Sequence, residues 1–272
     1  MNYTKTLFLI LCMFVFSVTK ADIIIQTTDV ITTPGTEFTI PFIIYGASEE
    51  EGTPITSAYF VMTFDTAALQ YMQFLNFNPL LPQNEWFFSG NNNTGIVAGN
   101  WIDNNLLPIP LPEGSTMVEV KFKAKPGTSP LTFITLEFLD ADFNIIPATG
   151  DNGSFASLQN VNFQINMRDQ AISPQGVFLA GSFNNWSTTA TPMTVGDSTI
   201  YSATLQMICD NAYEYRFVNG NSPSGYETVP AECGIAGSGG YNRTLTIPAG
   251  DTTLPDVCFS SCVACPPLTL TN

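Results

Sequence analysis

The chain of 272 residues contains no histidine, and this absence removes several classes of chemistry. Without an imidazole there is no Ser-His-Asp or Cys-His nucleophile, no histidine general base and no zinc site that needs a histidine ligand. Charged residues make up only 11% of the chain, whereas about a quarter is usual in soluble proteins. The polar surface must therefore come from Asn, Thr, Ser and Gln, which suit strands and turns better than long helices.

Basic residues are scarce as well. Lys and Arg number 8 against 23 Asp and Glu, which gives a formal net charge of −15. A chain of this sign repels phosphate groups, so we expect neither nucleic acid nor an anionic membrane surface as a partner. Hydrophobic residues make up 44% of the chain, which is enough to fill a core and argues against wholesale disorder.

The first 21 residues have the features of a secretory signal peptide. Lys5 precedes an apolar run over residues 7–18, and Lys20 and Ala21 follow it. The run is short for a bilayer span, although an uncleaved membrane anchor is the alternative. Because no second apolar stretch is long enough to span, we expect no membrane span in the mature chain. We predict an exported protein that is secreted, extracellular or held at the cell surface.

Five of the six cysteines lie in the last quarter of the chain, and the sixth, Cys12, lies in the apolar run. In an exported protein this clustering indicates disulfides, and the odd number leaves one thiol free or paired outside the chain. We expect bonds that tie the loops at 208–210 and 231–234 to a C-terminal strand at 254–259, with the pairing left open. The two-residue gap between the last two cysteines also suits zinc, but no second pair has matching spacing. The disulfide candidates are Cys209, Cys233, Cys258, Cys262 and Cys265.

Most of the chain alternates apolar and polar residues with a period of two, between turns rich in Gly, Pro, Asn and Asp. Examples are residues 38–44, 58–64, 118–124, 161–167 and 213–217. Only residues 65–73 suit a short helical turn. The pattern predicts an all-β fold, with two immunoglobulin-like or jelly-roll β-sandwich domains in tandem. We place the first domain at 22–157, the second at 158–265 and a tail at 266–272.

The first domain contains Phe64-Asp65-x-x-x-Leu69 and, over 120–130, Val-Lys-Phe-Lys-Ala-Lys-Pro-Gly-Thr-Ser-Pro. With these motifs it resembles cohesins, the receptor modules of cellulosome scaffolds. The resemblance implies a sheet face that binds a dockerin-like protein. Ser57 and Tyr59 stand on the strand that carries recognition, where Asn and Asp are usual in one major class. They are candidate protein contacts, and a spacer domain without a partner is the alternative.

Residues 140–144 offer oxygen ligands at alternate positions, as a calcium loop does. Asp140, Asp142 and Asn144 are the candidate ligands, but the glycine expected next for the sharp turn of such a loop is missing. A hairpin turn explains the segment equally well. We therefore expect no cofactor, with calcium as a weak candidate.

The second domain contains Gly-Val-Phe-Leu-Ala-Gly-Ser-Phe-Asn-Asn-Trp over 176–186 and Tyr-Glu-Tyr-Arg-Phe-Val-Asn-Gly over 213–220. With these motifs it resembles the early-set starch- and glycogen-binding modules over about 160–260. Such modules occur beside amylolytic enzymes. A glucan presents apolar C–H faces ringed by hydroxyl groups, so its site needs a flat aromatic surface and a few hydrogen-bond donors.

By this resemblance, Trp186 is the aromatic platform, and Arg216 and Asn242 hydrogen-bond sugar hydroxyls. The family's second Trp is missing, and Tyr226 is the candidate replacement. The structural alternatives are that Trp186 caps the end of the sandwich and that Arg216 pairs with Glu214 or Glu227 on the surface.

We expect no enzyme, because two sandwiches fill the length and no pair of carboxylates lies in a catalytic setting. The leading prediction is non-catalytic binding of a starch- or glycogen-type glucan, as an accessory to extracellular polysaccharide catabolism. The alternative is a cell-surface assembly or adhesion protein whose cohesin-like domain binds a dockerin-like or other protein. A fragment of a longer secreted protein is a third possibility.

Overall fold

The computed structural model describes residues 21–196 and 199–266. This part of the chain consists of strands, turns and short 3-10 helices, which confirms the expected all-β fold class. No helix in it is long and apolar enough to cross a membrane. The predicted signal peptide lies outside the described residues except for Ala21, and so does the predicted tail except for Pro266.

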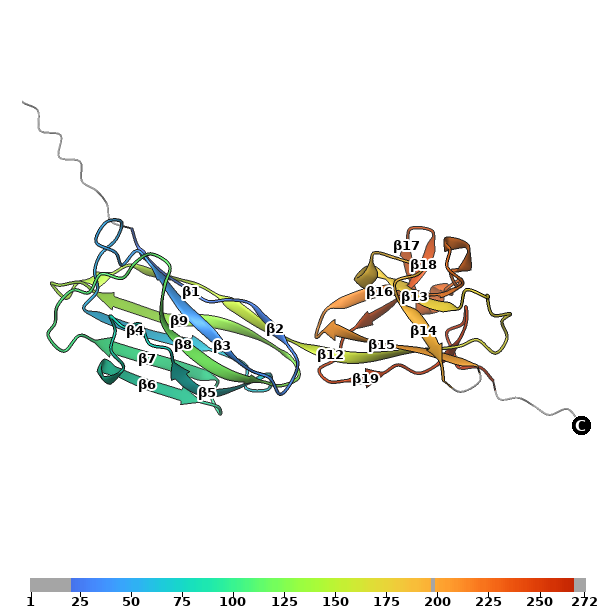
Figure 1. The fold of residues 1–272 in the computed structure, drawn as a ribbon, viewed down its shortest axis with the longest axis horizontal. Coiled ribbons are helices and arrows are strands. Elements are labelled where there is room, and N and C mark those ends of the chain that lie inside the picture. Colours follow the sequence, from blue (N-terminus) through green and yellow to red (C-terminus); the bar gives the residue numbers. More distant parts are fainter. Residues whose placement is uncertain (1–20, 197–198, 267–272) are drawn as a thin grey trace, which may run out of the picture.

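The first domain packs two sheets face to face (Figure 1). One has the strand order β11-β1-β3-β8-β5, and the other runs β12-β9-β4-β7-β6. The elements are β1 (Ile23–Gln26), β2 (Val30–Thr32), β3 (Glu37–Tyr45), β4 (Ser57–Thr63), β5 (Leu69–Leu75), η1 (Gln83–Glu85), β6 (Trp86–Asn91), β7 (Ile96–Ile102), β8 (Ser115–Ala124), β9 (Thr128–Leu139), β10 (Ile145–Ile146) and β11 (Ala148–Asp151).

Aromatic side chains fill the core between these sheets. The ring centroid of Phe42 lies 4.9 Å from that of Phe60 and 5.0 Å from that of Phe133, both edge to face. Trp86 stacks on Phe88 at 5.0 Å. Each such pair adds about 0.5–1.5 kcal/mol beyond the area it buries. The alternation predicted for residues 38–44 and 118–124 places the apolar members of β3 and β8 in this core.

The helical turn considered for residues 65–73 is replaced by a strand. The chain makes one turn in which Leu69 N donates to the Asp65 carbonyl oxygen at 2.9 Å. It then enters β5, which pairs with β8 from Leu69 onward. The burial of Leu69 and Phe74 in the core outweighs the weak helical preference of this short segment.

One long strand, β12 (Gly153–Asn166), belongs to both domains (Figure 1). Its first part pairs with β9 and its second part with β15, so the predicted boundary between 157 and 158 falls inside a strand. At that point Ser157 is fully buried: its hydroxyl accepts from Gly127 N at 2.8 Å, and its carbonyl accepts from Cys209 N at 2.9 Å. A hydrogen-bonded strand therefore replaces a linker, and it restricts how the domains move.

The second domain packs the sheet of β12 and β15 against β13, β16 and β18. Its core holds Val161 and Phe163 of β12 together with Leu179 and Phe217 from the opposite side. The elements are β13 (Val177–Gly181), η2 (Ser182–Asn184), β14 (Pro192–Val195), β15 (Ile200–Ile208), β16 (Ala212–Asn219), η3 (Pro223–Gly225), η4 (Ala231–Cys233), β17 (Ile235–Gly237), β18 (Gly240–Thr246), β19 (Thr252–Thr253) and β20 (Val257–Cys258).

In the part of the chain that the structure describes, the cysteines form two disulfides, Cys233–Cys262 and Cys258–Cys265, with Cα atoms 5.6 and 5.0 Å apart. Cys209 is a buried free thiol, and its burial raises its pKa. The bond expected from the 208–210 loop is thus wrong, because Cys209 sits in the domain junction beside Ser157. The bond expected from the 231–234 loop exists, but it reaches Cys262 rather than the 254–259 segment.

Candidate functional site

A tight turn after β13 presents Trp186. Asn184 holds this turn: its Oδ1 accepts from Gly181 N at 2.9 Å, and its Nδ2 donates to the Leu179 carbonyl at 3.0 Å. Asn185 and Trp186 both have left-handed backbone conformations, with φ of 53° and 60°. This conformation is costly for a bulky residue, so the surrounding contacts must enforce it, and such strain concentrates at functional positions.

Tyr226 fixes the same turn from the other side. It follows η3, and its hydroxyl donates to the Trp186 carbonyl oxygen at 2.8 Å. The guanidinium carbon of Arg216 lies 5.6 Å from the centre of the Tyr226 ring, which is a cation–π geometry. Partial burial raises the pKa of the Tyr226 phenol, against the opposing effect of the Arg216 charge. The phenol is therefore a neutral donor at physiological pH.

Arg216 and Asn242 join through a chain of hydrogen bonds. Arg216 Nε donates to Asn242 Oδ1 at 2.6 Å, and Asn242 Nδ2 donates to Glu214 Oε2 at 2.7 Å. Arg216 is only 8% exposed, and its Nη2 is buried without a hydrogen-bond partner. Within the described residues Arg216 forms no ion pair, so the surface-pair alternative for it is wrong. The Nη2 group of Arg216 is therefore a donor that a ligand oxygen could satisfy.

These side chains line one open hollow of about 510 Å³. The structure brings all four predicted carbohydrate-binding residues together there, from the η2 turn, β16, the segment after η3 and β18. Their role in sugar binding stays a prediction. Sequence reasoning missed Ala236, Gly237 and Ser238, because small residues of a hairpin carry no chemical signature, and it considered Glu214 only as an ion-pair partner. The lining comprises Trp186, Glu214, Arg216, Tyr226, Ala236, Gly237, Ser238 and Asn242.

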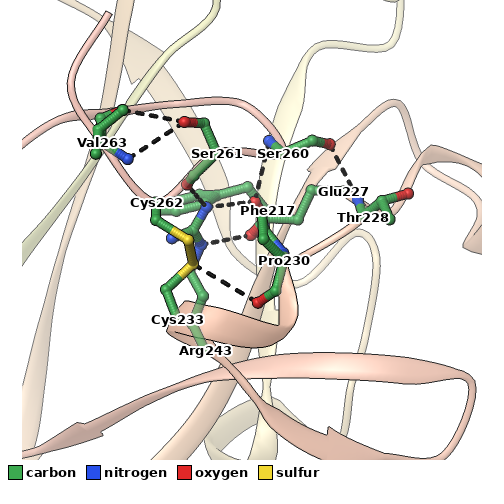
Figure 2. A network of polar contacts seen from close by, with 10 residues as sticks. All are labelled: Phe217, Glu227, Thr228, Pro230, Cys233, Arg243, Ser260, Ser261, Cys262 and Val263. Atoms are coloured by element: carbon green, nitrogen blue, oxygen red, sulfur yellow. Dashed lines mark hydrogen bonds and ion pairs between the residues drawn. A yellow bond between two sulfur atoms is a disulfide. The ribbon is translucent and has the colours of Figure 1, made fainter.

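A buried ion pair joins the residues that directly follow two lining residues, Glu227 after Tyr226 and Arg243 after Asn242 (Figure 2). Arg243 donates to both carboxylate oxygens of Glu227, at 2.9 Å from Nε and 2.7 Å from the terminal nitrogen. Glu227 Oε1 also accepts from Phe217 N at 2.9 Å. Burial opposes the Arg243 charge, but the Glu227 carboxylate outweighs it and raises the pKa of Arg243. Cys233–Cys262 lies beside the pair, so this corner is stiff.

In the first domain, Tyr59 lies on the outer face of the sheet. The register places Tyr59 of β4 opposite Asn100 of β7, and Asn100 opposite Phe87 of β6. The three line a shallow hollow of about 210 Å³, and Phe87 is 73% exposed. Ser57 lies two residues before Tyr59 on the same face. Sequence reasoning missed Phe87, although its place next to the buried Trp86 signals an outward side chain.

The calcium candidates form a self-contained turn between β9 and β10. Asp140 Oδ1 accepts from Asn144 N and from Asp142 N, both at 2.9 Å. These bonds, the one from Asn144 first, hold the pKa of Asp140 below its usual range. A separate group in the described part of the chain gathers Asp169, Cys258 and Cys265, but its cysteines are joined in a disulfide and do not offer thiolates.

Residues 160–231 match the family model described as carbohydrate-binding module 48 (isoamylase N-terminal domain). Solved cohesins are similar to the first half of the chain. The OlpA cohesin, in a type I cohesin–dockerin complex from Clostridium thermocellum, is 17% identical, with 50% of this chain and 99% of that chain covered and a TM-score of 0.44.

Two further solved structures are similar over the same half. The CaCohA2 domain from Clostridium acetobutylicum is 20% identical, with 51% of this chain and 92% of that chain covered and a TM-score of 0.43. A non-cellulosomal cohesin from the archaeon Archaeoglobus fulgidus is 18% identical, with 50% and 91% covered and a TM-score of 0.41. A search of curated proteins found no match. The chain is thus similar to both kinds of module, in the order expected from its sequence.

Proposed function

We propose that the second domain binds a neutral glucan of the starch or glycogen type without cleaving it, outside the cytoplasm. The observation that carries this proposal is the convergence of Trp186, Tyr226, Arg216 and Asn242 on one hollow within the segment that matches a carbohydrate-binding module. The two disulfides favour an oxidising compartment, as expected for an exported protein.

The chemistry of the hollow suits a sugar chain. The indole of Trp186 offers an apolar face for C–H groups, and the guanidinium of Arg216, which lines the hollow, offers N–H groups for hydroxyl oxygens. Among the lining residues only Glu214 carries a carboxyl group, and it already accepts from Asn242. Glycoside hydrolysis needs two carboxyl groups about the scissile bond, so this hollow supports binding rather than hydrolysis.

The test is retention of residues 22–272 on insoluble starch, with cellulose and chitin beside it. We expect retention on starch, which Trp186→Ala abolishes and Tyr59→Ala leaves intact. Circular dichroism of Trp186→Ala controls for folding, since Trp186 lies in a strained turn. Absence of wild-type retention on every polymer would refute glucan binding. Equal retention of wild type and Trp186→Ala would place the site elsewhere.

A second function is favoured by the exposed Phe87 beside Tyr59. Aromatic side chains on a flat sheet face anchor protein partners, because they bury much area at little entropic cost. We propose that this face binds a dockerin-like protein, as the OlpA cohesin does in its complex. In calorimetry with a type I dockerin, Phe87→Ala should abolish binding and Trp186→Ala should not. A wild type that binds no dockerin supports the spacer alternative.

A further inference from the structure

A second hollow of about 390 Å³ adjoins the first. The two share Arg216, Tyr226 and Ser238 in their linings, so they meet along this line of side chains. Beyond it, the second hollow is lined by Tyr241, which is 40% exposed, and by the backbone of Gly239 and Gly240. The surface at this end of the domain is therefore a groove of two compartments, with Trp186 in the first and Tyr241 in the second.

The unused donor of Arg216 lies close to Gly240, in the hairpin that lines the second compartment. A Cβ placed on Gly240 would lie 3.6 Å from Arg216 Nη2, and Gly240 lines the second hollow and not the first. Its φ of 125° favours glycine. Because glycine has no side chain, only backbone lies beside the guanidinium at this point. A buried donor without a partner carries a free-energy cost. A hydroxyl or ring oxygen of a ligand in this compartment would remove that cost.

The one acidic residue that lines this compartment already has its hydrogen-bond partners. Glu227 lines it, but this residue is only 2% exposed and its carboxylate accepts from Arg243 and Phe217 N. The compartment therefore offers a ligand one cationic side chain, two phenols, the hydroxyl groups of Ser238 and Thr228, and backbone, with no free carboxylate. This combination suits an uncharged polyhydroxyl group beside an aromatic ring, which is the chemistry of a further sugar unit.

We propose that the second compartment is an additional subsite for the glucan, in which Tyr241 packs against a sugar ring and Arg216 Nη2 donates to an oxygen of it. This inference rests on the proposed function and deepens it. The ligand class becomes a linear chain long enough to pass from Trp186 across Tyr226 to Tyr241. The short sugars that fill only the first compartment then bind more weakly than long ones.

The test is calorimetry of residues 22–272 with linear α-1,4-linked gluco-oligosaccharides, from the disaccharide to the heptasaccharide. We expect the affinity to rise with the length of the sugar. Tyr241→Ala should lower the affinity about tenfold for the longest sugars only, which corresponds to the loss of about 1.4 kcal/mol from one aromatic contact. The matched control is Ile235→Ala, which truncates an exposed apolar side chain of the same hairpin outside both linings. It should leave every affinity unchanged.

The outcomes separate the two proposals. In one outcome, Trp186→Ala loses all binding and Tyr241→Ala binds every sugar as well as wild type does. This result would support glucan binding and overturn the second subsite. An equal loss in Tyr241→Ala for short and long sugars would also overturn it, because Tyr241 would then belong to the first compartment. A wild type that binds no oligosaccharide would refute both.

Discussion

The two domains share a fold class but bury different side chains. The buried polar residues of the first have short side chains, and aromatic rings dominate its core. These polar residues are Thr27, Thr56, Asp103, Ser129 and Ser157. The second buries a set of long polar and charged side chains close to its candidate site. These are Arg216, Glu227, Asn242 and Arg243. Both described disulfides also lie in the second domain.

The difference follows from the surface that each domain must present. In the first domain the candidate contact face consists of outward side chains on paired strands, so the sheet itself positions Tyr59 and Phe87. In the second domain the hollow depends on loops and a glycine-rich hairpin, which have little rigidity of their own. The ion pair and the disulfides supply that rigidity. A buried ion pair is thus used where backbone pairing is insufficient.

We expect the largest difference in stability between the two domains when the buried ion pair of Glu227 and Arg243 is broken. In Glu227→Ala the buried Arg243 loses its carboxylate partner, and breaking such a pair costs about 3–5 kcal/mol. We expect the second domain to unfold at much lower denaturant concentration. Fluorescence of Trp186 reports that domain, and Trp86 and Trp101 report the first.

The matched control is Glu37→Ala, which removes an exposed ion pair with Lys121 in the first domain. Because solvent screens that pair, we expect no measurable change in stability. An Ala variant of Glu227 as stable as wild type would contradict the idea that charge holds the second domain together.

The next effect concerns the disulfide beside the ion pair. Cys233–Cys262 spans a separation of 29 residues, and removal of a bond of this kind costs about 2–4 kcal/mol. We expect the double variant Cys233→Ser with Cys262→Ser to lower the thermal transition of the second domain and to weaken starch binding. The first domain has no cysteine in residues 21–157, so reductant should leave its transition in place. If both thermal transitions shifted together, the two domains would unfold as one cooperative unit coupled through β12.

The fold was largely predictable, because burial of alternate residues decides it. The alternation in residues 161–167 became the buried face of β12, and the same holds for β3 and β8. The shared strand could not be foreseen, since a strand that serves two cores in turn has the same pattern as two strands. The bonds of Ser157 that fix the junction depend on tertiary proximity, and sequence spacing carries no trace of them.

The candidate site was predictable only where side chains carry a distinct chemistry. Trp186, Arg216, Tyr226 and Asn242 came from a family resemblance, and the structure places them around one hollow. The glycines and Ser238 of the hairpin were missed, because small residues signal turns of many kinds. The pairing of Glu227 with Arg243 rather than Arg216 depends on which face of β16 and β18 each residue occupies.

The smallest expected effect lies in a single hydrogen bond, from the Tyr226 hydroxyl to the Trp186 carbonyl. Burial raises the pKa of Tyr226, so the bond is complete below the ordinary phenol value of about 10 and is lost as the pH rises through the raised value. With no histidine in the chain, glucan affinity should be flat at neutral pH and fall only in strong alkali. Tyr226→Phe should bind about fivefold more weakly, as the loss of about 1 kcal/mol implies, and should lack the alkaline step.

Calorimetry across the alkaline range measures this, with circular dichroism to establish that the domain stays folded. The core phenol of Tyr215 does not interfere, because burial raises its pKa to about 12. An alkaline step of equal size in Tyr226→Phe would assign it to another group. Tyr226 would then contribute to the hollow through its ring alone. The left-handed turn at Trp186 would depend on Asn184 and on backbone hydrogen bonds, just as the contact face of the first domain depends on its paired strands.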